Sequence, residues 1–263
     1  MSRYCSDKDE HRELSAKLLC LMQTTLSGTI YVYQGEELGQ RNMPPSFEPS
    51  EYKDVETINY WEKVSPISPI PSHPQPKPCH LTHQKQMKAL YPDNEEKLSF
   101  AKRVMQRKAR DHARTPVQWT SESPNAGFCD PDVKPWMRVN DDYKTVNAAA
   151  QRAHSDENSL SVLQFWKRGL AARKQHKDAL VYGDFELLDP EDGHDQIFAY
   201  KRSGEEEAFV TILNFSEEVV EWELPEKAGV QKWVAGNYTA GAPEKAIKGK
   251  LTLKPWEALL GMC

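Results

Sequence analysis

The side chains with the clearest capacity for catalysis in this sequence are its carboxylates. A mechanism that uses one carboxyl group as nucleophile and another as acid and base needs the two about 5 Å apart, on either side of one bond. Glu36 and Glu37 directly follow a short apolar run, but neighbours along an extended strand point to opposite faces. The acidic runs 205–207 and 217–218 lie between apolar segments and are expected to be solvated turns. The sequence therefore predicts no catalytic pair.

Four stretches, taken in order, carry a family resemblance. Residues 28–39 read Gly-Thr-Ile-Tyr-Val-Tyr-Gln-Gly-Glu-Glu-Leu-Gly, residues 110–119 read Arg-Asp-His-Ala-Arg-Thr-Pro-Val-Gln-Trp, and Asn-Ala-Gly-Phe at 125–128 and Lys-Pro-Trp at 134–136 follow. Their order and spacing resemble the C-terminal half of the fungal maltase and isomaltase type of α-glucosidase. That type belongs to the α-amylase clan, glycoside hydrolase family 13. The resemblance runs over nearly all 263 residues.

The resemblance implies a retaining enzyme that removes terminal α-linked glucose from maltose, isomaltose, sucrose or similar sugars. In that family the catalytic carboxylates precede the segment that matches Ser2-Arg3-Tyr4, the last of them in an Asn-His-Asp block that this sequence lacks. We therefore expect a truncated α-glucosidase whose catalytic residues lie upstream of Met1, and no hydrolysis by this chain alone. The preference for α-1,4 or α-1,6 linkages depends on residues outside these stretches.

Two residues are expected to bind substrate because of the resemblance. Arg110 matches the arginine that reaches glucose hydroxyls in the cleavage subsite, and Glu56 matches a position near the outer subsite. The fixed fork of donors on a guanidinium suits paired sugar oxygens. The alternatives are an ion pair of Arg110 with Asp111 or another nearby carboxylate, and an exposed loop glutamate at position 56.

Four neighbouring residues have simpler interpretations. Arg114 and Trp119 are expected to hold the fold, the arginine by pairing loops and the indole by filling space beside a barrel. Trp136 could stack against a sugar, but burial is the expectation because aromatic rings dominate cores. His112 is assigned no chemistry.

One helix and one strand must position residues 34–39. Apolar residues at spacings of three and four predict an amphipathic helix over residues 9–25, ended by Gly28. The continuous apolar run at 30–33 is typical of a strand buried on both faces of a parallel sheet. By resemblance, these are the seventh helix and eighth strand of a (β/α)8 barrel, whose active site lies at the C-terminal ends of the strands.

Further helices are predicted over residues 94–110 and 157–176, the second capped by Ser155 or Asp156. Its apolar stripe is expected to comprise Leu160, Leu163, Trp166, Leu170 and Ala171. After Lys177, short β-branched and aromatic runs separated by turns predict an antiparallel β-sandwich. These runs are 180–188, 196–201, 209–215, 219–224, 230–235, 250–253 and 256–260. The expected fold is α/β plus all-β: the C-terminal part of a TIM barrel over 1–176, with an inserted subdomain, and a β-sandwich domain over 177–263.

A proline-rich interval at 64–84 matches neither part. It holds six prolines without helical or strand periodicity, so we expect a disordered, extended insert, and we interpret it as a retained intron translated in frame. Cys79, His80 and His83 could be read as metal ligands, but closed zinc sites usually take four ligands on a firm scaffold. No metal or cofactor is expected.

Composition limits the partners. A net charge of −5 with interspersed signs disfavours nucleic acid and suits a neutral α-glucoside. No apolar run has the length of a signal peptide or membrane span, and five cysteines without framework spacing favour a reducing cytoplasm. The sequons at Asn214 and Asn237 are therefore expected to be unused. A lone barrel strand has unpaired backbone edges, so self-association through those edges is expected.

Two other interpretations remain open at this stage. One is a noncatalytic interaction protein, by analogy with α-amylase-like heavy chains that lack catalytic residues and serve transporters. The other is an incomplete gene model whose missing half lies immediately upstream.

Overall fold

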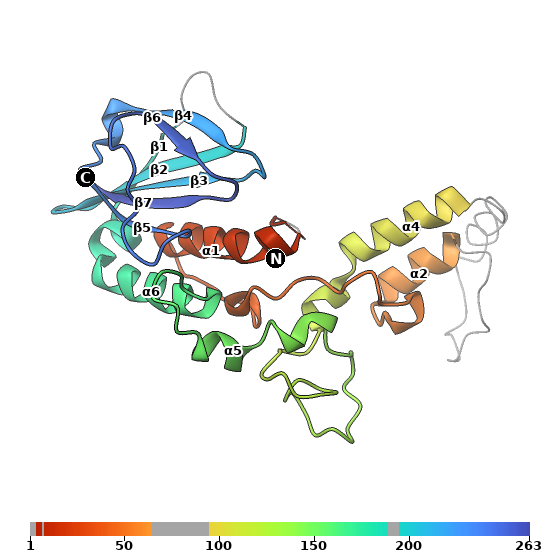
Figure 1. The fold of residues 1–263 in the computed structure, drawn as a ribbon. Coiled ribbons are helices and arrows are strands. Elements are labelled where there is room, and N and C mark those ends of the chain that lie inside the picture. Colours follow the sequence, from red (N-terminus) through yellow and green to blue (C-terminus); the bar gives the residue numbers. More distant parts are fainter. Residues whose placement is uncertain (1–3, 7, 65–94, 189–194) are drawn as a thin grey trace. The chain divides into compact units, whose positions relative to one another are not determined.

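The computed structural model describes residues 4–6, 8–64, 95–188 and 195–263. These residues form two compact units (Figure 1). The sheet unit contains the described residues of 1–40, 117–128 and 142–263, and the motif unit contains those of 41–116 and 129–141. Most of the proline-rich interval, with Cys79, His80 and His83, lies outside the described residues.

Five α-helices and seven strands are assigned in the described parts of the chain. The helices are α1 (Asp9–Thr25), α2 (Val55–Val64), α4 (Glu95–Lys108), α5 (Ala148–Ala153) and α6 (Val162–Gln175). The strands are β1 (Asp184–Leu187), β2 (Ile197–Ser203), β3 (Ala208–Asn214), β4 (Val220–Leu224), β5 (Lys232–Gly236), β6 (Gly249–Leu253) and β7 (Ala258–Met262). None of these helices is long and apolar enough to cross a membrane.

The strands form two antiparallel sheets, which confirms the predicted β domain. The larger sheet has the order β1-β2-β3-β7-β5, and β4 and β6 form the smaller one. In β4, Val220, Trp222 and Leu224 are buried whereas Glu221 and Glu223 are exposed, the alternation expected of a strand with one face on a core. The buried side chains of Trp222 and Leu224 pack against those of β2, β3 and β7 between the two sheets.

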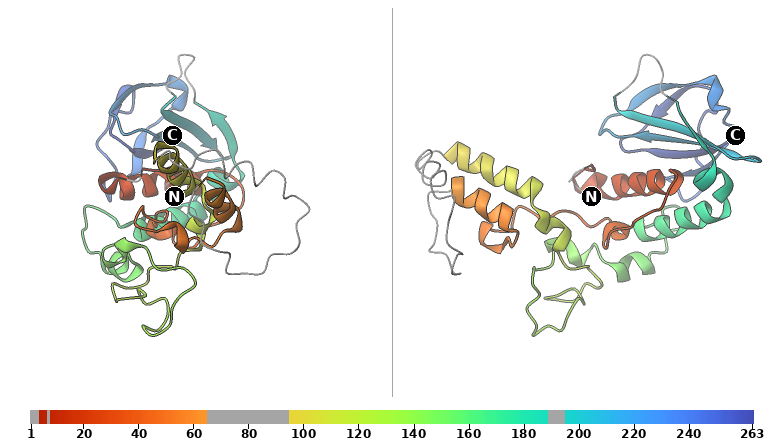
Figure 2. Two further views of the ribbon diagram at one scale, coloured as in Figure 1. Left: turned by 90° about the vertical axis from the view of Figure 1, so that its right-hand side faces the viewer. Right: turned by 180° about the vertical axis from the view of Figure 1, so that it is seen from behind.

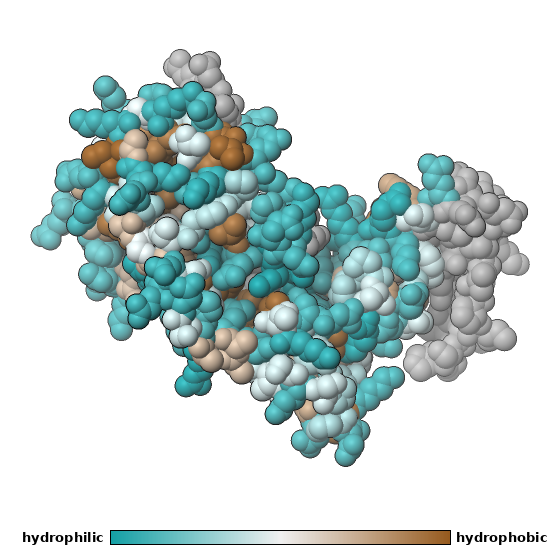
Figure 3. Space-filling model, in the orientation of Figure 1, coloured by the Kyte–Doolittle hydropathy of each residue, from teal (hydrophilic) through white to brown (hydrophobic). Residues whose placement is uncertain are grey.

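The other face of the larger sheet carries α1 and α6, as Figure 1 and the right panel of Figure 2 show. Strand β3 is buried along almost its whole length because it contributes to both cores. Phe209 and Leu213 pack with the helices, and Val210 and Ile212 pack against the smaller sheet. Apolar residues gather around the sheets in Figure 3, while most of the visible surface is hydrophilic.

Helix α1 has the predicted bounds, residues 9–25. Leu18, Cys20 and Leu21 are buried against α6 and the sheet. Arg173 of α6 closes the C-terminal end of α1 by donating to the carbonyls of Leu26 (2.5 Å) and Gly28 (2.6 Å). Unpaired carbonyls at a helix end need such partners, so α6 fixes the point where the chain leaves α1.

The prediction for the third helix was wrong in its start and its buried face. Helix α6 begins at Val162, and Ser161 caps it: its hydroxyl accepts from Gln164 N (3.2 Å), and Ser161 N donates to the Gln164 side chain (3.1 Å). This reciprocal capping box fixes the first turn. Val162, Phe165 and Trp166 are buried, whereas Leu170 is 41% exposed. Trp166 is buried as predicted, but Val162 and Phe165 complete the face that packs on α1 and the sheet, in place of Leu170 and Ala171.

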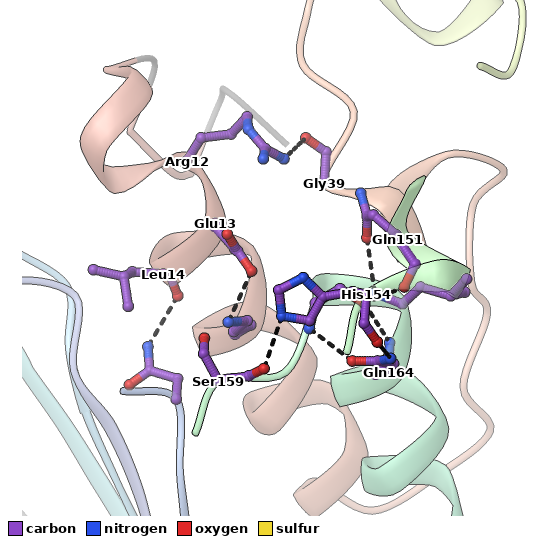
Figure 4. A network of polar contacts seen from close by, with 12 residues as sticks. Arg12, Glu13, Leu14, Gly39, Gln151, His154, Ser159 and Gln164 are labelled. Atoms are coloured by element: carbon purple, nitrogen blue, oxygen red, sulfur yellow. Dashed lines mark hydrogen bonds and ion pairs between the residues drawn. The ribbon is translucent and has the colours of Figure 1, made fainter. Parts of the chain in front are cut away.

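Polar contacts join α1, α5 and α6 (Figure 4). Gln151 of α5 donates to Leu38 O (2.7 Å) and accepts from Leu163 N (3.0 Å). Arg12 of α1 donates to Gly39 O (3.4 Å). These contacts fix residues 36–39 against the helices.

The predicted strand at 30–33 is not present. These described residues have no strand assignment, and Tyr31 and Tyr33 are 85% and 60% exposed. A strand of a parallel sheet needs neighbouring strands for its backbone hydrogen bonds, and the described residues supply none beside this segment. The prediction of a buried strand at this apolar run is therefore wrong for the described chain.

The two sequon asparagines are structural. Asn214 is fully buried and donates to the carbonyls of Glu218 and Lys254, at 2.9 Å each. Asn237 is 3% exposed and donates to Trp256 O (2.6 Å). In the folded chain neither amide is accessible for modification.

Candidate substrate-binding site

The second residue of the motif at 110–119, Asp111, is a buried aspartate that fixes the start of α2. The Oδ2 atom of Asp111 accepts hydrogen bonds from Lys53 N (2.7 Å) and Asp54 N (2.8 Å), and Asp111 is 0% exposed. A buried carboxylate is costly unless it is paired and hydrogen-bonded. Two backbone donors and Arg114, which donates to Asp111 Oδ1 (3.0 Å), satisfy this carboxylate.

Asp54 is the N-cap of α2. Its Oδ2 accepts from the backbone N (3.2 Å) and hydroxyl (3.0 Å) of Thr57, a bond pattern that satisfies free donors in the first turn of a helix. Burial alone raises the pKa of Asp54, but the bonds from Thr57 and the charges of Arg110 and Arg114 outweigh it, so the pKa is lowered below its usual 3.8. Arg114 thus lies between two carboxylates, 3.0 Å from Asp111 Oδ1 and 3.5 Å from Asp54 Oδ1.

The two predicted substrate-binding residues lie together. Arg110 Nη2 is 2.5 Å from Glu56 Oε2, and the two side chains are 67% and 74% exposed. Asp111 bonds to residues 53, 54 and Arg114. Arg110 pairs with Glu56 instead, which is the ion pair with a nearby carboxylate that was expected as an alternative. Glu56 lies in the first turn of α2 and is not a loop residue, which corrects that alternative. The exposed ion pair is therefore presented on a framework that Asp54, Asp111 and Arg114 hold.

Two tryptophans near the motif are more exposed than predicted. Trp136 is 61% exposed, and the Arg114 guanidinium lies 5.8 Å from its ring centroid, within the range of a cation–π contact. Trp119 is 50% exposed and does not fill an interior space. Burial of an indole needs a surface against it, and the described residues leave half or more of each side chain open. Arg114 does pair loop and helix residues, as predicted.

A small core supports the site from within the motif unit. Met43, Phe47, Tyr52 and Met105 are buried together. Burial, with the charges of Asp111 and Glu51, raises the pKa of Tyr52 to about 12, so its hydroxyl stays neutral. His112 accepts a hydrogen bond at Nδ1 from Met43 N (3.1 Å), which is a positioning contact for this core.

Glu36 and Glu37 were excluded as a catalytic pair on the expectation that they lie on an extended strand, and that expectation is wrong. They lie in a 3-10 helix, Glu36–Leu38, and not in a strand. The Glu36 carboxylate accepts from Gln23 Nε2 (2.5 Å) and Tyr33 N (3.2 Å), and that of Glu37 accepts from Gly35 N (2.9 Å). Each carboxylate therefore takes part in the turn that follows residues 30–33.

The sequence signal for the supporting aspartates was overlooked. Asp54 is followed three positions later by Thr57, and an aspartate before a helical segment is a cap signal, but no helix was predicted at 55–64. Asp111 lies inside a recognised motif, yet its bonds to residues 53 and 54 cross 57 or more positions of sequence. Among the residues that the structure describes, no group of three or more His, Cys, Asp or Glu could hold a metal ion.

The described helices up to α6 and most of the antiparallel β domain that follows them fall within the matches of two family models, and together these models define a class of glycoside hydrolase. The model of the α-amylase catalytic domain matches residues 1–183, and that of the maltogenic amylase C-terminal domain matches residues 185–260. The chain belongs to the α-amylase family of glycoside hydrolases.

Curated relatives agree with this assignment. An α-glucosidase and an oligo-1,6-glucosidase of Saccharomyces cerevisiae are 34% and 35% identical to the chain, with 98% of the chain covered in each case. An α-glucosidase of Candida albicans is 37% identical over 98% of the chain. The chain spans 38% of the two Saccharomyces relatives and 39% of the Candida one. The resemblance to fungal maltases and isomaltases is thus confirmed.

Solved structures show the same architecture. The trehalulose synthase MutB of Pseudomonas mesoacidophila superposes with a TM-score of 0.74 at 27% identity, covering 98% of this chain and 39% of that one. A trehalose-6-phosphate hydrolase of Bacillus licheniformis gives 0.74 at 30% identity, covering 97% and 40%. The predicted fold, part of a glycosidase barrel followed by an antiparallel β domain, is confirmed.

Proposed function

We propose that this chain forms the C-terminal part of an exo-acting, retaining α-glucosidase of the cytoplasm, and that Arg110 and Glu56 contribute to its sugar-binding pocket. The observation that carries the proposal is the exposed Arg110–Glu56 pair, held on a buried framework in a chain whose curated relatives include α-glucosidases and oligo-1,6-glucosidases. The substrate class is a neutral α-glucoside with a terminal glucose, such as maltose, isomaltose or sucrose.

The pair has the chemistry that a sugar requires. A guanidinium carries five N–H donors and no acceptor, whereas an ionised carboxylate only accepts. One contact between them leaves further donors on Arg110 and acceptors on Glu56 for adjacent sugar hydroxyls. Because both side chains are exposed, the ion pair contributes at most about 1 kcal/mol to stability, so substrate can rearrange it at little cost.

Exposed Trp136 supports the same location. Its ring contacts Arg114, which in turn pairs with the aspartates that hold Arg110 and Glu56 in place. Aromatic rings offer an apolar surface with a defined geometry, so Trp136 is a candidate stacking surface for an outer glucose unit.

We also propose that the chain alone does not hydrolyse glucosides. Four described carboxylates in or beside the motifs, Glu36, Glu37, Asp54 and Asp111, take part in capping and turn contacts. An ion pair that binds sugar hydroxyls cannot replace a nucleophile and an acid positioned on either side of one bond.

The test is an assay of the purified full chain with p-nitrophenyl α-glucoside, alongside maltose binding followed by saturation-transfer NMR. We expect weak maltose binding, lost in Arg110→Ala and retained in the surface control Arg152→Ala, and no turnover above background. Hydrolysis that persists in rigorously purified Arg110→Ala protein would refute the claim of inactivity. Equal maltose binding by the Arg110→Ala and Arg152→Ala variants would refute the assigned site.

A further inference from the structure

A cavity of about 180 Å³, partly open to solvent, lies in the sheet unit between its helices and the larger sheet. Leu21 of α1, Phe165 and Ala172 of α6, and Phe209 and Leu260 of the sheet contribute to its lining. Every lining residue belongs to the sheet unit, whereas Arg110 and Glu56 belong to the motif unit. The cavity is thus distinct from the proposed sugar-binding site.

Small residues at the helix crossing create the space. A Cβ atom added at Gly169 would lie 3.1 Å from the Thr24 side chain, so α1 and α6 approach closely at this point. Ala172, about one helical turn further along α6, and Ala235 on β5 then face the cavity with only methyl groups. These small side chains leave a recess larger than a water molecule between the helices and the sheet.

Several polar groups of the lining are bonded within the protein, and the charged lining residue Arg168 is exposed and donates to Ala240 O. Thr24 Oγ1 donates to Cys20 O (2.8 Å), and Thr25 Oγ1 donates to Leu21 O (2.6 Å). His176 Nδ1 lies 2.7 Å from Glu207 Oε2. Buried water needs two to four polar partners, and apolar cavities of roughly 150 Å³ stay dry and take up benzene-sized molecules.

We propose that this cavity is a binding site for an uncharged single-ring molecule, aromatic or alicyclic, with at most one small polar group. A single ring would fill the space between Phe165, Phe209 and Leu260. It would make van der Waals contacts that these side chains lack when the cavity is empty. Because most of the lining is apolar, a sugar or an ion would lose hydration there in exchange for few hydrogen bonds.

The experiment titrates the full chain with toluene and follows both the thermal midpoint and the methyl region of the NMR spectrum. Because a ligand that binds only the folded state stabilises it, we expect a saturable rise in the midpoint and shifts of Leu21 and Leu260 methyl signals. Glucose at the same concentrations is expected to produce neither.

Ala172→Leu fills the cavity, and the matched control Ala171→Leu adds the same groups at the neighbouring exposed position of α6. We expect toluene affinity to fall at least tenfold in the first variant and to be unchanged in the second. Ala235→Leu fills the space from the sheet and gives the same readout if Ala172→Leu does not fold.

Equal toluene affinity in the filled variants and the control would overturn the proposal, and so would the absence of a saturable response in the unmodified chain. Arg110→Ala protein is expected to bind toluene normally, which separates failure of this proposal from failure of the proposed sugar site.

Discussion

At the scale of single residues, Asp111 determines the geometry of the candidate site. Its carboxylate takes two backbone N–H groups at the start of α2 and one guanidinium N–H of Arg114. Because these contacts engage Asp111 fully, Arg110 is left to pair with Glu56 at the surface. One buried side chain therefore supports the arrangement of two exposed ones.

Asp111→Ala is expected to destabilise the motif unit by about 3 kcal/mol. Truncation leaves two backbone donors and the charge of Arg114 without this partner, and removing one member of a buried hydrogen-bonded pair costs several kcal/mol. Urea unfolding followed by tryptophan fluorescence measures the loss. Asp132→Ala, at an exposed position of the same unit, serves as control and should change stability by less than about 0.5 kcal/mol. Equal stability of the two variants would contradict this role.

Acid should weaken the motif unit through Asp54. Its pKa in the folded chain is lowered below the usual 3.8, so the ionised form favours folding. That contribution is fully present above pH 3.8 and is lost as the pH falls through the folded pKa. Urea midpoints measured between pH 3 and pH 6 should fall at the acid end and fall less steeply in Asp54→Asn protein. The same pH dependence in both proteins would show that Asp54 does not contribute.

At the scale of elements, the first turn of α6 depends on its true cap. Ser161→Ala removes the hydroxyl that accepts from Gln164 N and is expected to cost about 1 kcal/mol of unfolding free energy, the usual effect of losing a cap. Ser155→Ala, at the cap position that the sequence first indicated, should have no measurable effect because Ser155 is exposed and lies before the helix. Urea unfolding of both variants tests this, and a larger loss for Ser155→Ala would be the contrary result.

The exposed segment 30–33 is expected to drive self-association. Tyr31, Val32 and Tyr33 expose apolar side chains, and contiguous exposed apolar side chains favour association with another chain. Tyr31→Ser combined with Tyr33→Ser should shift the chain towards monomer in analytical ultracentrifugation. Tyr182→Ser replaces another strongly exposed tyrosine, 77% accessible, and should leave the association constant unchanged. Loss of association in Tyr182→Ser alone would place the contact elsewhere.

The sequence predicted elements well where local pattern and burial agree. Helix α1 has the predicted bounds because Leu18 and Leu21 repeat along one face and Gly28 follows. The seven strands form because each pairs by backbone hydrogen bonds with another strand of the same C-terminal stretch. The strand predicted at 30–33 is absent because the described residues place no partner strand beside it. The start of α6 was misplaced because Ser155 and Ser161 are both acceptable caps, and only tertiary packing selects between them.

The candidate site, too, was predicted from the sequence only in part. Arg110 and Glu56 were identified through the family resemblance, and the structure places them 2.5 Å apart. Asp54 and Asp111 could not be linked from the sequence, because their connection spans α2, α4 and the interval between them. The exposure of Trp136 was also not foreseeable, since its residue type favours burial and only the surrounding surface determines the outcome.

At the scale of the whole molecule, the chain combines an incomplete share of a large catalytic domain with a β domain that has its own two-sheet core. It spans 38% of its Saccharomyces relatives. The predicted boundary between residues 176 and 177 stays a prediction, because α1 and α6 bury their apolar faces on the larger sheet. These helices and the strands share one core, so cutting between them would expose both.

The buried sequon asparagines affect how the protein can be produced. Asn214 and Asn237 each bridge two backbone carbonyls in the interior, and a glycan attached during translocation would reach them before folding completes. A bulky hydrophilic group at either position could not enter the core. Secretion through a glycosylating pathway should therefore yield misfolded material, whereas synthesis in a bacterial cytosol leaves both amides free to make these bonds.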